Sequence, residues 1–136
     1  MPGRGGLAIE ALSRGMQRAV LIDHDRRAVD TIRDNLERTG FADRAELYRN
    51  DARRALSILA KRGLAFDLVF LDPPYRYTNM DEIMLEMEEK QLFAEGARIV
   101  IEHDAKHTYE PSIGRSVCVR RAVYGEAAVS IYRVQD

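Results

Sequence analysis

The sequence contains one cysteine, Cys118, no tryptophan and only four prolines among its 136 residues. A single cysteine excludes an internal disulfide framework and fits a reducing cytosol. No apolar run approaches the roughly 20 residues of a membrane span. The glycine-rich N-terminus lacks the apolar core of a signal peptide. We therefore expect one cytoplasmic domain over residues 1–136, without repeats or linkers and with no membrane partner.

The charge is nearly balanced, with a formal net charge of −1, but arginines far outnumber lysines. Near-neutral charge argues against tight non-specific binding to nucleic acid. The planar, forked guanidinium of arginine nevertheless matches phosphates and stacks on bases. The composition is therefore still compatible with a local basic patch that binds nucleic acid. With 46% hydrophobic residues, the chain can bury a real core.

Hydrophobic periodicity predicts strands and helices in alternation. Strands are expected over residues 19–23, 45–49, 66–71 and 97–102, helices over 7–14, 26–39, 52–62 and 80–89, and a terminal hairpin from 116–124 and 127–133. Strands that alternate with helices are typical of a parallel sheet. The order predicts an α/β fold with a mostly parallel sheet and a C-terminal antiparallel hairpin.

The chain is organised around Asp72-Pro73-Pro74-Tyr75, which directly follows the apolar run 66–71. The prolines donate no backbone hydrogen bonds, and Pro73 biases Asp72 away from helix. One acid, two carbonyl acceptors and one aromatic ring therefore stand at the carboxyl end of a strand, where open α/β sheets bind ligands. Such a cluster suits a planar amine. An ordinary strand-terminating turn is the alternative interpretation.

Asp-Pro-Pro-Tyr resembles the motif of methyltransferases that move a methyl group from S-adenosylmethionine to an exocyclic amino group of a base. The similarity extends over nearly the whole chain. The stretch Gly3–Gly15 is similar to the cofactor loop and first helix of the bacterial family that methylates a guanine N2 in small-subunit ribosomal RNA. The resemblance implies a Rossmann-like class I methyltransferase fold, S-adenosylmethionine as cofactor, and 16S ribosomal RNA or a small ribosomal subunit assembly intermediate as partner.

The resemblance also implies catalytic roles. Asp72 and a carbonyl of Pro73 or Pro74 would hold both N–H bonds of the guanine amino group, which turns its lone pair toward the methyl group. Tyr75 would stack on a base splayed from the RNA, at about 1–3 kcal/mol. The gain is alignment and preorganised electrostatics, with no metal required.

Cofactor binding is expected at Gly3 and Gly5, whose lack of a side chain permits close backbone approach. An ordinary glycine-rich tail is the alternative. Asp23 ends a strand about 20 residues later, the spacing at which an acid meets ribose hydroxyls in dinucleotide folds. Either Asp23 or Asp25 could instead cap the next helix, and we favour Asp25 for the cap. The resemblance adds His24 to the cofactor site.

Asp51 and Ala52 complete the implied cofactor site, with the Asp51 carboxylate on the adenine amino group and the Ala52 backbone N–H on a ring nitrogen. A helix N-cap is the alternative for Asp51. Asp72 is shared between cofactor and substrate. His103 and His107 lie four residues apart without a further ligand set, so no metal site is expected.

The start of the chain departs from the family, because only Met1 and Pro2 precede Gly3 where a first strand belongs. In the family's sheet that strand lies between the strands that end in Asp23 and Asp72. Its loss leaves hydrogen-bonding groups of both neighbours unpaired. We therefore expect either a truncated chain, self-associating through exposed strand edges, or another strand in the gap.

Three rival functions remain open from the sequence. An adenine-N6 DNA methyltransferase would use the same four residues. A nicotinamide-dependent Rossmann enzyme would share the glycine loop and Asp23, but it leaves Asp-Pro-Pro-Tyr unexplained. The missing strand motivates a third hypothesis, a non-catalytic RNA-binding remnant of the fold.

Overall fold

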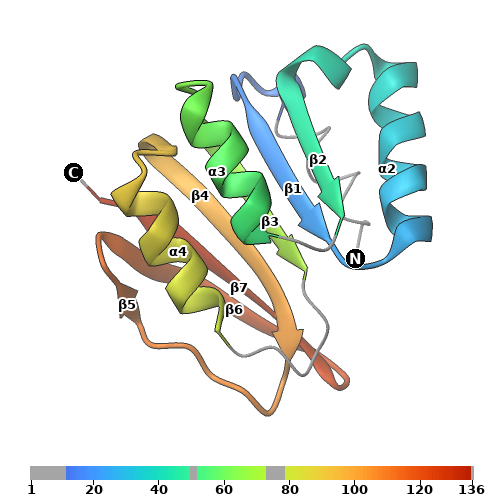
Figure 1. Cartoon of the computed structure of the whole chain (residues 1–136). Helices are drawn as coiled ribbons and strands as arrows, with labels where there is room; N and C mark the ends of the chain where they lie inside the picture. Colours follow the sequence, from blue (N-terminus) through green and yellow to red (C-terminus); the bar gives the residue numbers. More distant parts are fainter. Residues whose placement is uncertain (1–11, 50–51, 73–78, 136) are drawn as a thin grey trace.

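The computed structural model describes residues 12–49, 52–72 and 79–135, which form a seven-stranded sheet flanked by helices (Figure 1). The strand order is β2-β1-β3-β4-β7-β6-β5. The strands are β1 (Ala19–Asp23), β2 (Ala45–Arg49), β3 (Phe66–Asp72), β4 (Phe93–Asp104), β5 (Ser112–Ile113), β6 (Ser116–Tyr124) and β7 (Ala127–Val134). The helices are α2 (Arg26–Thr39), α3 (Ala52–Lys61) and α4 (Met80–Glu89), with a short 3-10 turn, η1 (Ala42–Arg44). These elements confirm the predicted α/β order.

The sheet divides into two halves with different pairing. In the parallel half, β1 pairs with both β2 and β3, and β3 pairs in parallel with β4. In the antiparallel half, β7 lies between β4 and β6 and runs antiparallel to both. The hairpin that joins β6 to β7 turns at Gly125, whose φ of 63° is left-handed, as its position in the predicted turn requires.

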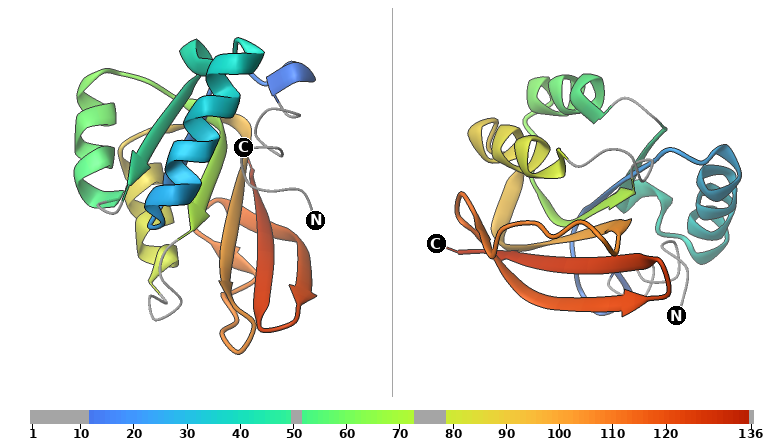
Figure 2. Two further views of the ribbon diagram at one scale, coloured as in Figure 1. Left: turned by 90° about the vertical axis from the view of Figure 1, so that its right-hand side faces the viewer. Right: turned by 90° about the horizontal axis from the view of Figure 1, so that it is seen from below.

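Alternate strand residues enter two cores on opposite faces of the sheet. On one face, α3 and α4 pack over alternate residues of β1, β3 and β4, including Val20, Val69 and Ile99. On the other face, α2 packs Ile32 and Leu36 over the intervening strand positions. Figure 2 shows the two helical layers from the side and from below. Burial on both faces explains why β1 and β3 are continuous apolar runs.

The N-cap of α2 follows the sequence prediction. The Asp25 side chain accepts a hydrogen bond from the Arg27 backbone N–H at 2.9 Å, so Asp25 is the N-cap. Gly40 ends the helix with a φ of 80°. Only two residues, His24 and Asp25, therefore separate the end of β1 from the start of α2, which makes the connection tight.

Side chains from later elements hold the segment that precedes β1. The Asp67 carboxylate accepts hydrogen bonds from the backbone N–H groups of Gln17, at 2.6 Å, and Arg18, at 2.9 Å. The Arg44 guanidinium donates to the carbonyls of Leu12 and Met16. These bonds satisfy backbone groups that no sheet partner reaches.

The structure contradicts the predicted gap between the strands that end in Asp23 and Asp72. β1 and β3 pair directly, from Ala19 opposite Leu68 to Asp23 opposite Asp72. Their backbone groups bond to each other, so the expected unpaired edges do not exist at this place and self-association through them is not expected. Within the described residues, the open edges of the sheet lie at β2 and at β5 with β6.

Two further differences concern the antiparallel half. β4 begins at Phe93 and ends at Asp104, beyond both ends of the predicted strand 97–102, because Phe93 pairs with Phe66 and Asp104 pairs with Ala127. The two-residue strand β5 was not predicted. Cys118 is half-buried against the core. None of the helices in the described ranges combines the length and apolar composition that crossing a bilayer requires.

Candidate active site

Asp23 and Asp72 are buried side by side at the carboxyl edge of the parallel half. They end the adjacent strands β1 and β3, occupy the same register position, and are 2% and 3% exposed. Two apolar runs of matched register place them there. Buried carboxylates require hydrogen-bond donors or positive charge nearby. The matched register of two buried carboxylates makes this edge the candidate ligand site.

His24 joins the two acids. Its ring Nδ1 lies 2.8 Å from the Asp72 carbonyl oxygen, and its backbone N–H donates to the same oxygen at 3.2 Å. A carbonyl accepts only, so Nδ1 carries the proton in this contact. The ring also lies 3.7 Å from the Asp23 carboxylate. His24 thus holds the backbone at the point where the Asp-Pro-Pro-Tyr motif begins.

Asp23 and Asp25 have separate tasks. Asp23 accepts a hydrogen bond from the Asp25 backbone N–H at 2.8 Å, while Asp25 caps α2. The prediction that Asp25 is the cap is confirmed. The ribose-binding role of Asp23 stays a prediction, and its burial at the strand end supplies the geometry for it.

Oxygen and nitrogen atoms of Asp23, His24 and Asp72 lie within 4.8 Å of one another, a spacing that could accommodate a cation. Nδ1 of His24 donates to the Asp72 carbonyl, so the lone pair on Nε2 of the neutral ring is the one left to a ligand. One carboxylate oxygen of Asp23 accepts a hydrogen bond from a backbone N–H. Carboxylate oxygens are also acceptors for the hydroxyl groups of an organic ligand.

The remaining predicted site residues are Gly3, Gly5, Asp51 and residues 73–75, which lie outside the described residues. Ala52 is the first residue of α3, so its backbone stands at a helix start next to the end of β2. The structure therefore brings together three of the predicted residues, Asp23, His24 and Asp72.

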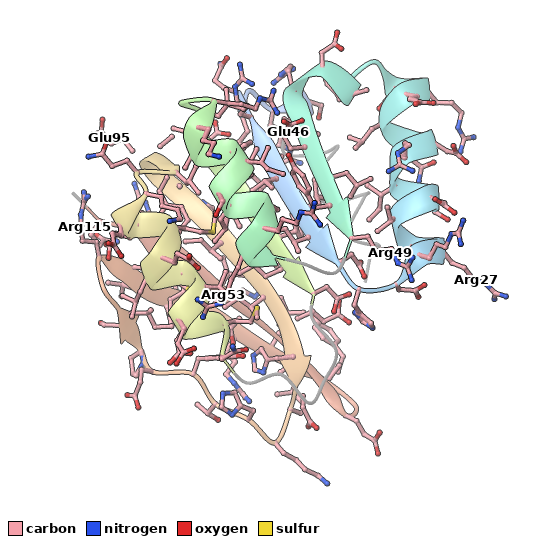
Figure 3. All side chains as sticks on the ribbon, viewed as in Figure 1. Arg27, Glu46, Arg49, Arg53, Glu95 and Arg115 are labelled. Carbon is pink, nitrogen blue, oxygen red and sulfur yellow. The ribbon has the colours of Figure 1, made fainter. Side chains whose placement is uncertain are left out.

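Arginines surround this edge. Arg49 ends β2, is exposed, and lies opposite Asp23 in the register. Arg27 and Arg53 are the second residues of α2 and α3, the helices that follow β1 and β2, and Figure 3 labels all three arginines. The Arg53 guanidinium lies 3.5 Å from carboxylate oxygens of Glu82 and Glu86 on α4. The edge thus combines a buried acidic centre with a basic rim.

The sequence analysis missed a polar cluster at the end of β4. His103 is buried, with Nε2 at 2.8 Å from the Ser130 hydroxyl and Nδ1 at 2.9 Å from the Asp104 carbonyl. The rings of His107 and Tyr109 pack edge-on beside it. Burial lowers the pKa of His103, which favours the neutral ring. The available signal was Ser130, a polar residue at an inward position of an alternating strand.

Tyr132 lies next to this cluster and ties β7 to the chain before β5. Its hydroxyl donates to the Glu110 carbonyl at 2.6 Å, and burial raises the pKa of Tyr132 to about 12. The hydroxyl therefore remains protonated and serves as a structural donor.

Comparison with known proteins identifies the family. A family described as Conserved hypothetical protein 95 matches residues 1–133. The chain is 40% identical to YlbH of Bacillus subtilis over 131 residues, covering 96% of this chain and 71% of YlbH. It is 30% identical to the ribosomal RNA small subunit methyltransferase D of Escherichia coli over 135 residues, covering 96% of this chain and 64% of that enzyme, so it spans less than two thirds of that relative.

Solved structures agree in fold. A conserved hypothetical protein of Streptococcus pyogenes superimposes with a TM-score of 0.78 at 36% identity, covering 98% of this chain and 81% of the other. An O-methyltransferase from Bacillus cereus in complex with SAH superimposes with a TM-score of 0.64 at 14% identity, over all of this chain and 82% of the other.

The sheet order, the helices on both faces and the carboxyl-edge acids define a Rossmann-like fold of the class I methyltransferase type. Within that class, the chain belongs to the Conserved hypothetical protein 95 family. The resemblance to the bacterial 16S ribosomal RNA methyltransferase family, drawn from the glycine loop and Asp-Pro-Pro-Tyr, is confirmed at the level of the family.

Proposed function

We propose that this chain transfers a methyl group from S-adenosylmethionine to the exocyclic N2 of a guanine in small-subunit ribosomal RNA. The observation that carries the proposal is the buried pair Asp23 and Asp72, in register at the carboxyl edge of two parallel strands. The E. coli relative, named as a small-subunit methyltransferase, supports the RNA substrate. The Asp-Pro-Pro-Tyr motif supports an exocyclic amino group as the acceptor.

The carboxylate oxygens at this edge are acceptors that fit the cofactor. Asp23 would accept hydrogen bonds from the ribose hydroxyls, and two neighbouring carboxylates favour the positive charge of a sulfonium. When bound, S-adenosylmethionine supplies an electrophilic methyl group. The Asp51 carboxylate and the Ala52 backbone N–H would hold the adenine.

The chain's own residues then prepare the acceptor. His24 fixes the Asp72 backbone carbonyl through two hydrogen bonds, which limits rotation of the backbone where the Asp-Pro-Pro-Tyr motif begins. Asp72 and a proline carbonyl would accept the two N–H bonds of the guanine amino group, with Tyr75 on the face of the base. Positive charge develops on nitrogen during transfer, and the Asp72 carboxylate stabilises it without reorganising.

The experiment is transfer of a labelled methyl group from S-adenosylmethionine to small-subunit ribosomal RNA transcribed without modified bases, presented free and in assembled subunits. The RNA is then digested to nucleosides. N2-methylguanosine is the expected product. Methylation of adenine N6 in a DNA duplex, with none in the RNA, would contradict the proposal. RNA binding with neither cofactor binding nor transfer would instead support a non-catalytic RNA-binding remnant.

A further inference from the structure

Three arginines lie together on the antiparallel half, on the face opposite α3 and α4. Arg98 of β4 pairs with Arg133 of β7, and Arg120 of β6 pairs with Ile131, two residues before Arg133. Ile131 in turn pairs with Val100, which follows Arg98 on the same face. Arg98, Arg120 and Arg133 therefore form one contiguous group, named here the arginine patch.

The arginine patch breaks a local rule of sheet construction. Like charges directly opposite each other destabilise a sheet, and Arg98 stands directly opposite Arg133. All three side chains of the patch are exposed, and none forms an ion pair or side-chain hydrogen bond with any described residue. Positions that violate such a rule with no compensation among the described residues are expected where a ligand supplies it.

No helix of the described residues covers the face that carries the patch. In the right panel of Figure 2, α3 and α4 lie above the red strands β6 and β7, and no helix of the described residues lies below them. Apolar side chains are exposed on the same face at both ends of β6, with Val117 37% and Tyr124 48% exposed. An arginine group flanked by an exposed aromatic ring fits a nucleic-acid strand better than a solvated surface.

The position of the patch connects it with the active edge. Arg98 lies opposite Leu68 on β3, four residues before Asp72, so the patch lies about 13 Å from the edge along the strands at roughly 3.3 Å per residue. Tyr124 pairs with Ala127, which lies opposite Asp104 at the carboxyl end of β4. A strand of nucleic acid along β6 would therefore pass the arginines and then Tyr124 on its way to the edge.

We propose that the arginine patch docks the phosphate backbone of the RNA substrate and that Tyr124 stacks on one of its bases. The proposal rests on the proposed function for the identity of the nucleic acid. The arginines bind phosphates without regard to sequence, whereas the residues at the active edge select the base. The patch would thus position RNA away from the reacting atoms, and its arginines are positioning residues.

The test compares two triple variants of equal net charge. The patch variant is Arg98→Gln, Arg120→Gln and Arg133→Gln. The control variant changes Arg33, Arg38 and Lys61 to Gln, three exposed cations on α2 and α3. Binding of a fluorescent fragment of unmodified small-subunit ribosomal RNA is titrated at several salt concentrations, and circular dichroism checks that both variants are folded.

Each lost phosphate contact lowers the salt slope by about 0.7 for a single strand, so the patch variant should lose about 2 units of slope. Raising salt fourfold should then weaken the unchanged protein about 16-fold more than the patch variant. The control variant should keep its slope. Tyr124→Ser should weaken binding with the slope unchanged, because stacking releases no counterions.

Equal losses in the patch and control variants would overturn the proposal, since net charge alone would explain them. An unchanged slope in the patch variant would also overturn it, as would light scattering that shows the patch joining two copies of the chain with RNA binding unaffected. Failure of the proposed function looks different: RNA binding through the patch would persist while no methyl group is transferred. If methyl transfer occurs and the patch variant keeps the salt slope of the unchanged protein, the proposed function holds and the patch proposal fails.

Discussion

The parallel and antiparallel halves of the sheet bury their strands differently. β1 and β3 are buried along almost their whole length, with helices on both faces. β6 is exposed at most positions, and the described helices cover only one face of its half of the sheet. The parallel half therefore presents its polar groups only where its strands end, whereas the antiparallel half presents them along a face.

This difference separates two tasks that a base-modifying enzyme must perform. Buried strand ends hold Asp23 and Asp72 with little freedom, as chemistry on a single atom requires. An open face holds arginines that tolerate a polymer in several registers. Substitutions in either half test this difference. We expect the largest effect, a loss of transfer rate, at the strand ends of the parallel half.

Asp72→Ala should reduce the single-turnover rate of methyl transfer by a factor on the order of 10²–10³, because one preorganised group that stabilises developing charge is removed. Cofactor affinity should stay within a few-fold. Asp72→Asn keeps an acceptor oxygen and should retain more activity than the alanine variant. Equal rates for the unchanged protein and Asp72→Ala would refute the assignment of the motif.

Truncation of a side chain should lower the free energy of unfolding far more in the parallel half than on β6. Leu21→Ala and Leu71→Ala each empty a buried site, on opposite faces of the parallel half, and should lower the free energy of unfolding by about 2–5 kcal/mol. Val123→Ala, 53% exposed on β6, should change it by less than about 0.5 kcal/mol. Urea unfolding measures all three. A large loss at Val123 would show that the antiparallel half is covered in solution.

Asp23→Ala should weaken S-adenosylmethionine binding by about 1.5–3 kcal/mol, or roughly 10- to 150-fold, through loss of a charged acceptor for the ribose. Calorimetry gives the affinity, and the transfer rate at saturating cofactor should change little. Asp25→Ala is the matched control: it removes the α2 cap at about 1 kcal/mol of stability and should leave affinity intact. If Asp25→Ala weakened binding as much as Asp23→Ala, the ribose assignment would fail.

The contrast between the halves also explains what the sequence could predict. β1 and α2 were predicted to the residue, because a continuous apolar run and a capped amphipathic stretch leave few alternatives. The direct pairing of β1 with β3 was not, because strand order depends on which backbone edges find each other, and no local pattern encodes that. β4 was predicted too short, since Gly96, with a φ of 70°, interrupts the alternation while the strand continues.

The sequence predicted that Asp23, His24 and Asp72 belong to the site, but it did not predict how they contact one another. Asp23 and Asp72 could be placed at one edge from the rule for parallel strands. The hydrogen bonds of His24 to the Asp72 carbonyl depend on the register of β1 against β3 and could not be foreseen. The arginine patch escaped notice for the same reason, because its members are far apart in the sequence.

The pH dependence of stability should arise in the antiparallel half, at His103. Burial lowers its pKa against the opposing effect of the Asp104 carbonyl, and Arg121 and His107 lower it further. The folded state therefore binds the proton less readily than the unfolded state, so stability is full above about pH 6.5 and falls as pH decreases through the folded pKa. Urea unfolding from about pH 5 to 8 should show this loss, and His103→Gln should flatten it. An identical pH slope in that variant would assign the effect to other groups.

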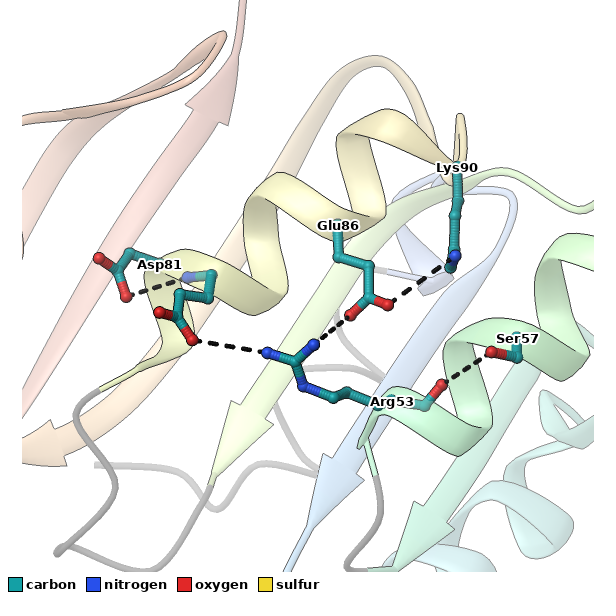
Figure 4. Close-up of polar contacts among 6 residues, drawn as sticks. Arg53, Ser57, Asp81, Glu86 and Lys90 are labelled. Carbon is teal, nitrogen blue, oxygen red and sulfur yellow. Dashed lines mark hydrogen bonds and ion pairs between the residues drawn. The ribbon is translucent and has the colours of Figure 1, made fainter.

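The smallest expected effect lies where the helices over the two halves meet. Arg53 of α3 is 3.5 Å from carboxylate oxygens of both Glu82 and Glu86 on α4, and Lys90 is 3.8 Å from Glu86 (Figure 4). The Arg53 side chain is 57% exposed, so water and salt screen the attraction.

A double-mutant cycle of Arg53→Gln with Glu86→Gln should give a coupling energy of about 0.2–1 kcal/mol, and molar salt should reduce it toward zero. Arg33 and Asp30 form an exposed ion pair within α2. This pair is the control, because it does not connect two different elements. A coupling above about 2 kcal/mol that salt leaves unchanged would mean that the pair is desolvated.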